Sequence, residues 1–203
     1  MLAYSRLGHG ESDAPEKPHT LTFMHDEAAM LPAILDEAGI DRATLFGHSD
    51  GGSIALIAAA HSPARVSALI LEAPHVFVED VSIASIERTT TDYESGGLRP
   101  RLARHHRDGD AAFRGWSDVW LDPDFRGWNL EEFLPRITCP TLIIQGENDE
   151  YGTLKQVQAV RRQLAGPVET LILPECGHSP HRDQPAAVLD AAARFVAITT
   201  VTP

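Results

Sequence analysis

The sequence predicts an α/β fold in which a mostly parallel sheet is flanked by helices and interrupted by an inserted helical cap. Short β-prone runs alternate with helical stretches, which is typical of βαβ units wound right-handed. The segment 76–136 breaks this alternation, because it has helix-like pieces and no convincing strand pattern. We therefore expect a core formed by residues 1–75 and 137–203 and a helical cap formed by residues 76–136.

The individual elements follow from local patterns. An amphipathic helix is expected at residues 22–38, where apolar residues recur at three- and four-residue steps, Gly39 supplies a stop and Pro32 should introduce a kink. Apolar, β-prone runs predict the strands, and runs of helix formers between them predict the helices. The expected strands are residues 2–4, 43–46, 66–71, 141–144 and 168–173, and the remaining helices begin near residues 52, 154 and 185.

Length and charge limit the class of protein. A chain of 203 residues can bury one substantial core, and its formal net charge of -12 disfavours nucleic acid and anionic membranes as partners. No apolar run approaches the ~20 residues that span a bilayer, and residues 1–6 do not resemble a secretory signal, so we expect a cytoplasmic protein. Cys139 and Cys176 lack metal-ligand spacing and fall at opposite ends of neighbouring expected strands, so they should be free thiols. We expect no metal and no cofactor.

The run Gly47-His48-Ser49-Asp50-Gly51 has the G-x-S-x-G form that places a serine on a sharp turn between a strand and a helix. A β-prone run precedes it and a long run of small and aliphatic helix formers follows it. The two glycines allow strained backbone angles and a close approach of helix and strand. Ser49 is therefore the candidate nucleophile, although an isolated pentapeptide could also be an ordinary turn.

A serine nucleophile needs a base and usually a carboxylate that orients the base. Asp149 and His178 each follow an expected strand at its carboxyl end, and parallel strands bring these ends to one edge of the sheet. Ser49, Asp149 and His178 should therefore converge, in the chain order expected after such a turn. The competing residues are His181 for the base and Glu147 or Glu150 for the acid.

With these motifs, nearly the whole chain resembles the α/β-hydrolase superfamily. The Ser-Asp-Gly-Gly run, the Leu-Glu-Ala-Pro run at residues 71–74 and the tryptophan-rich cap are similar to carboxylesterases of the valacyclovir hydrolase type. The resemblance implies that Ser49 attacks a small carboxylic ester, His178 acts as general base and then acid, and Asp149 fixes the imidazole tautomer. It also implies that the N–H of Asp50 contributes to an oxyanion hole.

Four residues are candidates for substrate binding. His48 and Asp50 flank the nucleophile and can shape the pocket, and in relatives with this turn the aspartate can bind a substrate amino group. Trp116 and Trp120 lie in the cap and either pack it onto the core or line an apolar cavity. The basic run at residues 99–107 is interpreted as a solvated face, with anion binding as the alternative.

The first strands of the sheet in this superfamily are not found in this sequence. One of the missing segments normally supplies a backbone N–H to the oxyanion hole, so one donor is missing as well. A truncated start is one explanation. The other is a minimal five-stranded sheet that pairs residues 2–4 with residues 43–46 and brings the Gly8-His9-Gly10 loop beside Ser49 as a donor. Open sheet edges would favour a homo-oligomer or instability. The alternative functions are a ligand-binding relative without turnover and, among enzymes, a C–C bond hydrolase, a lactonase or a perhydrolase.

Overall fold

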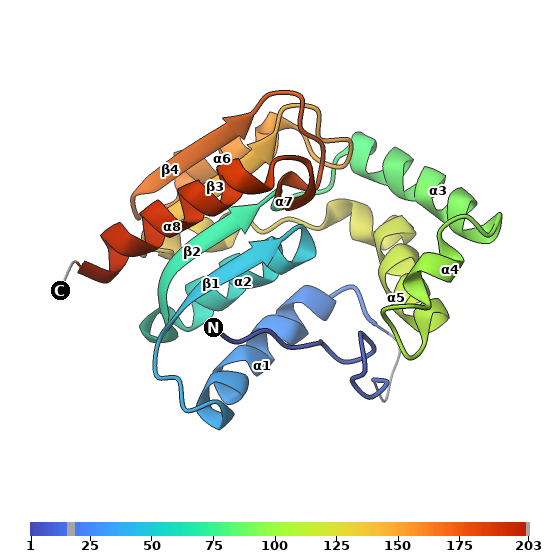
Figure 1. Ribbon diagram of the computed structural model, residues 1–203, viewed down its shortest axis with the longest axis horizontal. Helices are drawn as coiled ribbons and strands as arrows, with labels where there is room; N and C mark the ends of the chain where they lie inside the picture. Colours follow the sequence, from blue (N-terminus) through green and yellow to red (C-terminus); the bar gives the residue numbers. More distant parts are fainter. Residues whose placement is uncertain (16–18, 202–203) are drawn as a thin grey trace.

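Four parallel strands form the sheet of the computed structural model, which describes residues 1–15 and 19–201. The strands lie in the order β1-β2-β3-β4, and every neighbouring pair is parallel, so the predicted fold class is confirmed (Figure 1). The strands are β1 (Ala43–His48), β2 (Val66–Glu72), β3 (Thr141–Gly146) and β4 (Val168–Leu173).

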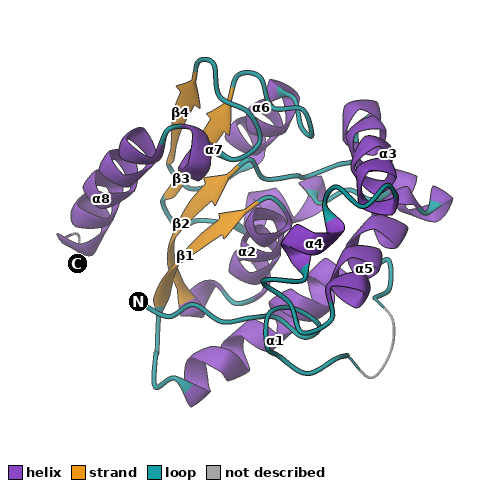
Figure 2. Cartoon of the chain, turned by 45° about the vertical axis from the view of Figure 1, so that its right-hand side comes forward, coloured by secondary structure: helices purple, strands orange, loops and turns teal. Residues whose placement is uncertain are grey.

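Helices cover both faces of this sheet (Figure 2). Along β2, Leu69 and Leu71 point to the face that carries α2 and α6, whereas Ala68 and Ile70 point to the face that carries α8. This alternation is the period of two expected for a strand buried on both sides. Helix α1 packs against α2. The helices are α1 (Phe23–Glu37), α2 (Asp50–His61), α6 (Leu154–Gln163), α7 (Pro180–Asp183) and α8 (Pro185–Val201).

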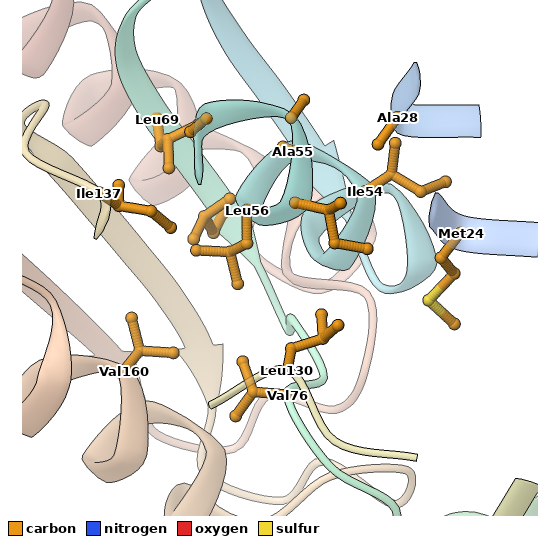
Figure 3. Packing of buried hydrophobic residues seen from close by; sticks show 14 of the residues in the cluster. Met24, Ala28, Ile54, Ala55, Leu56, Leu69, Val76, Leu130, Ile137 and Val160 are labelled. Atoms are coloured by element: carbon orange, nitrogen blue, oxygen red, sulfur yellow. The ribbon is translucent and has the colours of Figure 1, made fainter. Parts of the chain in front are cut away.

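The segment expected to form the cap packs against the core of the sheet domain. Val76 and Leu130 lie in the same buried cluster as Leu56 of α2 and Val160 of α6 (Figure 3). Figure 1 shows this segment beyond the carboxyl ends of β1 and β2. Its elements are α3 (Asp80–Glu94), α4 (Arg99–Leu102), α5 (Gly109–Leu121) and the short 3-10 helices η2 (Pro123–Gly127) and η3 (Glu131–Arg136). A further short 3-10 helix, η1 (Pro63–Arg65), lies outside this segment and precedes β2.

The prediction of a strand at residues 2–4 was wrong. Residues 1–15 contain no strand, and the sheet has four strands instead of five. Leu2 and Tyr4 remain 48% and 43% exposed, so three residues would gain too little burial to offset the entropy of ordering them as a strand. As a result β1 is an edge strand, and Phe46 on it is 53% exposed.

Two further observations complete the fold. Cys139 and Cys176 are buried free thiols, as expected. No helix within residues 1–15 and 19–201 has both the length and the apolar character needed to cross a bilayer.

Candidate active site

Ser49 stands on a strained turn between β1 and α2. Its φ of 54° and ψ of -122° lie outside the regions that side-chain-bearing residues favour. A Cβ on Gly47 would lie 2.2 Å from the carbonyl oxygen of Gly51, so only glycine allows the strand and the helix to cross this closely. The N–H of Ser49 also donates to the carbonyl of Glu72 at 2.8 Å, which fixes the turn against β2.

His178, in the loop after β4, connects Ser49 to an acid. Its Nε2 lies 2.9 Å from the Ser49 Oγ, and its Nδ1 lies 2.9 Å from each oxygen of the Asp149 carboxylate. A carboxylate can only accept, so Nδ1 carries the proton and Nε2 is free to accept from the serine hydroxyl. The structure thus brings together the three residues expected to form the triad.

Asp149 is held as a charged, buried carboxylate. Its side chain is 1% exposed, and burial by itself raises its pKa. The hydrogen bond from His178 and those from the N–H groups of Tyr151 and Gly152 outweigh burial, so the pKa of Asp149 is lowered overall. The amide of Gln145 also donates to it at 2.6 Å. The site therefore keeps the acid ionised at neutral pH.

The competing candidates have other contacts. The Nδ1 of His181 lies 2.7 Å from the carboxylate of the fully buried Glu72, so this histidine is engaged away from Ser49. Glu150 accepts from the backbone N–H of His178 at 3.2 Å, and Glu147 is exposed. Neither glutamate side chain has a hydrogen bond to the His178 ring among the described residues.

A cavity of about 450 Å³ opens over Ser49 and His178. Side chains from both the core and the cap line this cavity, so the edge of the sheet forms only part of its wall. Three of the four predicted substrate-binding residues, His48, Trp116 and Trp120, lie in its wall. Trp120 is 2% exposed and also packs against Phe125, so for this residue packing and pocket lining coincide.

His48 lies in this wall and also contacts the loop that carries His178. Its Nε2 is 2.7 Å from the carbonyl oxygen of His178, to which it donates. Burial lowers the pKa of His48 to about 4, so the ring is neutral at neutral pH. A neutral ring can hold the loop of His178 without adding charge near the Ser49 hydroxyl.

Asp50 lies behind the cavity wall and is not among the residues that line it. Its carboxylate is buried and accepts a hydrogen bond of 3.2 Å from the indole Nε1 of Trp120. Burial raises the pKa of Asp50 to about 6, despite the opposing influence of Arg6 and of this hydrogen bond. Asp50 is the first residue of α2, so its N–H is one of the first N–H groups of the helix, which have no acceptor within the helix.

The Gly8-His9-Gly10 loop does not supply the second oxyanion donor. The N–H of Gly8 donates to the carbonyl of Asp13 at 2.8 Å, and the N–H of Gly10 donates to the ring of His106 at 3.1 Å. Because residues 2–4 do not pair with β1 as a strand, the loop is not held beside the edge of β1. The loop instead contacts the cap.

Several residues of the cavity were missed by sequence reasoning. His75 lies shortly after β2, which ends at Glu72, and its position near a strand exit was the available signal. Burial lowers the pKa of His75 to about 3, and its Nδ1 has no hydrogen-bond partner among the described residues. Tyr151 and Arg182 also line the cavity, and so does Arg101 of the basic run at residues 99–107, for which anion binding was the alternative interpretation. Only the tertiary structure reveals that these residues reach the cavity.

Comparisons with known proteins identify the family of the chain. Residues 1–191 match the sequence profile described as the alpha/beta hydrolase family. The human serine hydrolase BPHL is 26% identical over 191 residues, which cover 89% of this chain and 64% of the human protein. The chain thus spans less than two thirds of that relative.

Solved structures show the same fold. A structure from a study of carboxylesterases of Nitrososphaera gargenis has a TM-score of 0.78 at 18% identity, with 97% of this chain and 79% of that chain covered. An esterase from Exiguobacterium antarcticum has a TM-score of 0.68 at 25% identity, with 94% and 78% covered. With its parallel sheet, its strained Ser49 turn and its match over residues 1–191, the chain belongs to the alpha/beta hydrolase family.

Proposed function

We propose that this protein is a serine hydrolase that cleaves small carboxylic esters through an acyl-enzyme intermediate. The observation that carries the proposal is the unbroken hydrogen-bond chain from the Ser49 hydroxyl through both ring nitrogens of His178 to the Asp149 carboxylate. A serine hydroxyl is a weak nucleophile by itself, and this arrangement is the one that activates it.

In the first half of the reaction, Ser49 Oγ attacks the ester carbonyl while His178 Nε2 takes its proton. Asp149 stabilises the imidazolium that forms, because it already accepts from Nδ1. The tetrahedral intermediate collapses when His178 returns the proton to the departing alcohol. An ester between Ser49 and the acyl group remains.

In the second half, water takes the place of the alcohol. His178 removes a proton from the water, the hydroxide attacks the acyl-enzyme, and the proton returns to Ser49 Oγ. One ester and one water thus give one acid and one alcohol. The N–H of Asp50 is the donor that we assign to the oxyanion in both halves.

The pocket and the relatives support an ester as the substrate. Trp116, Trp120 and Ile86 give the cavity apolar walls that suit a small acyl or alcohol group. BPHL carries the name serine hydrolase, and the protein from Exiguobacterium antarcticum is described as an esterase.

Fluorophosphonate labelling followed by p-nitrophenyl acetate turnover tests the proposal. We expect one label per chain, located on Ser49, and steady hydrolysis of the ester. Ser49→Ala should lose both signals. Ser62→Ala is the matched control, because Ser62 lies at the opposite end of α2, and it should behave like the unmodified chain.

Each other outcome has a definite meaning. If no label is found, or if Ser49→Ala is labelled equally well, Ser49 is not an activated nucleophile and the proposal is wrong. Labelling without turnover would favour the ligand-binding alternative. The observation behind that alternative is that the N–H groups of Gly8 and Gly10 donate elsewhere, leaving the oxyanion with one assigned donor.

A further inference from the structure

Two arginines from separate parts of the chain line the same cavity as Ser49. Arg101 lies on α4 in the cap, and Arg182 lies on α7, four residues after His178. Neither guanidinium has a hydrogen bond or an ion pair within residues 1–15 and 19–201. By contrast, Arg99 and Arg107 of the same basic run pair with Asp110 and Asp13. The cavity is therefore lined by two cationic side chains that have no partner in the part of the chain that the structure describes.

The other ionisable groups of the cavity do not cancel this charge. Glu150 is the only carboxylate among the lining residues that the structure describes, and it is already engaged by the backbone N–H of His178. Burial keeps His48 and His75 neutral, with pKa values lowered to about 4 and about 3. Two arginines and one glutamate thus line the cavity, in a chain whose formal net charge is -12.

We propose that this pocket selects esters that carry a carboxylate in the acyl or the alcohol part, an inference that rests on the proposed function. Guanidinium groups present paired N–H donors that match a carboxylate. Trp116 and Trp120 contact the apolar part of such a substrate, while Arg101 and Arg182 hold its free carboxylate. The basic run at residues 99–107 then binds an anion through Arg101.

The same charges oppose a cationic substrate. Asp50, the residue that would bind an amino group, does not line the cavity, and its carboxylate already accepts from Trp120. An ammonium group entering the cavity would meet Arg101 and Arg182, and among the described lining residues only Glu150 carries an opposite charge. Aminoacyl esters should therefore be poorer substrates than neutral esters of similar size.

Paired esters test this selection. The acyl arm compares mono-p-nitrophenyl glutarate with p-nitrophenyl pentanoate, and the alcohol arm compares 4-carboxyphenyl acetate with phenyl acetate. We expect at least one anionic ester to have the higher kcat/KM of its pair, mainly through a lower KM. Because both arginines are exposed, added salt should reduce the preference.

Variants of the two arginines test whether these residues cause the preference for anionic esters. Arg101→Gln and Arg182→Gln should each reduce the ratio of anionic to neutral kcat/KM by about tenfold. Arg104→Gln is the matched control, since Arg104 is exposed on the same basic run and does not line the cavity. It should leave the ratio unchanged. Equal fluorophosphonate labelling rates would show that the variants keep a folded site.

The possible failures are distinguishable. If neutral esters are hydrolysed and neither anionic ester is preferred, the selection is wrong and the proposed function stands. A preference that Arg104→Gln reduces as much as the two lining variants would reflect general surface charge and would also overturn the inference. If no ester is hydrolysed, the proposed function and the inference both fail.

Discussion

The indole Nε1 of Trp120 in the cap donates a 3.2 Å hydrogen bond to the carboxylate of Asp50, the residue next to Ser49. This contact joins residues that are 70 positions apart, and both are buried. It connects a residue of the cavity wall directly to Asp50, the first residue of α2, whose N–H we assign as a donor to the oxyanion. This hydrogen bond therefore links the cap directly to the turn that carries Ser49.

Trp120→Phe should destabilise the protein by about 1–3 kcal/mol, because a buried carboxylate loses its donor. The loss should be larger at pH 8 than at pH 5, since only the ionised form needs that donor. Trp128→Phe is a matched control, because the Nε1 of Trp128 is buried with no partner among the described residues. Urea unfolding at both pH values measures the difference. Equal losses in the two variants would show that the Trp120 hydrogen bond contributes nothing.

Asp50→Asn should change how stability depends on pH. The folded pKa of Asp50 is about 6, above the ordinary value of 3.8, so the folded state binds this proton more tightly than the unfolded state. The stability due to the protonated group is present below about pH 4 and is lost as the pH rises to about 6, a difference of roughly 3 kcal/mol. Asparagine does not titrate and has no such loss. The free energy of unfolding of Asp50→Asn minus that of the unmodified chain should therefore increase as the pH rises from about 4 to about 6.

Urea unfolding between pH 4 and pH 8 measures that difference. Asp190→Asn, on exposed α8 surface, removes the same formal charge and supplies the baseline to subtract. A corrected difference that stays flat across the window would mean that Asp50 titrates like an exposed aspartate.

Asp149→Asn should lower kcat on p-nitrophenyl acetate by roughly 10⁴-fold with little change in KM, because an amide no longer fixes the His178 tautomer. Glu147→Gln serves as the control, since Glu147 is an exposed acid two residues away, and its kcat should stay within about twofold. Steady-state kinetics on both variants decide between the two acids. Retained activity in Asp149→Asn would remove Asp149 from the proposed triad.

Gly47→Ala should destabilise the chain by at least about 1–3 kcal/mol, because its Cβ would collide with the backbone of Gly51. Gly51→Ala should be neutral or slightly stabilising, since nothing lies within 4 Å of the added Cβ and alanine favours the first turn of α2. Thermal unfolding compares the two. Similar melting temperatures would indicate that the crossing of β1 and α2 is looser than the structure has it.

The open edge of β1 predicts association between copies. Phe46 is 53% exposed there, and unpaired strand edges recruit other strands. Sedimentation velocity should show oligomers of the unmodified chain, and Phe46→Lys should shift it to monomer. Leu189→Lys, which alters an equally apolar residue that is 68% exposed on α8, should not. A monomeric unmodified chain would contradict this prediction.

The core of the sheet could be predicted because its signals are local. Residues 43–46, 66–71, 141–144 and 168–173 carry short apolar runs, and strands form at all four places. Residues 2–4 carry a similar short run but find no partner strand, and strand formation depends on pairing, which the local pattern does not contain. The Gly8-His9-Gly10 loop was misplaced for the same reason.

The sequence by itself determined the order of the elements and the turn at Ser49, because glycine spacing and strand exits are encoded in neighbouring residues. It also named Asp149 and His178 as candidate acid and base, since parallel strands bring their carboxyl ends to one edge of the sheet. Only the tertiary structure decided that Trp120 bonds to Asp50 and that Arg101 and Arg182 share one cavity with Ser49. Those relationships join the cap to the core across long sequence separations, where packing of distant surfaces sets the partner and no local pattern specifies it.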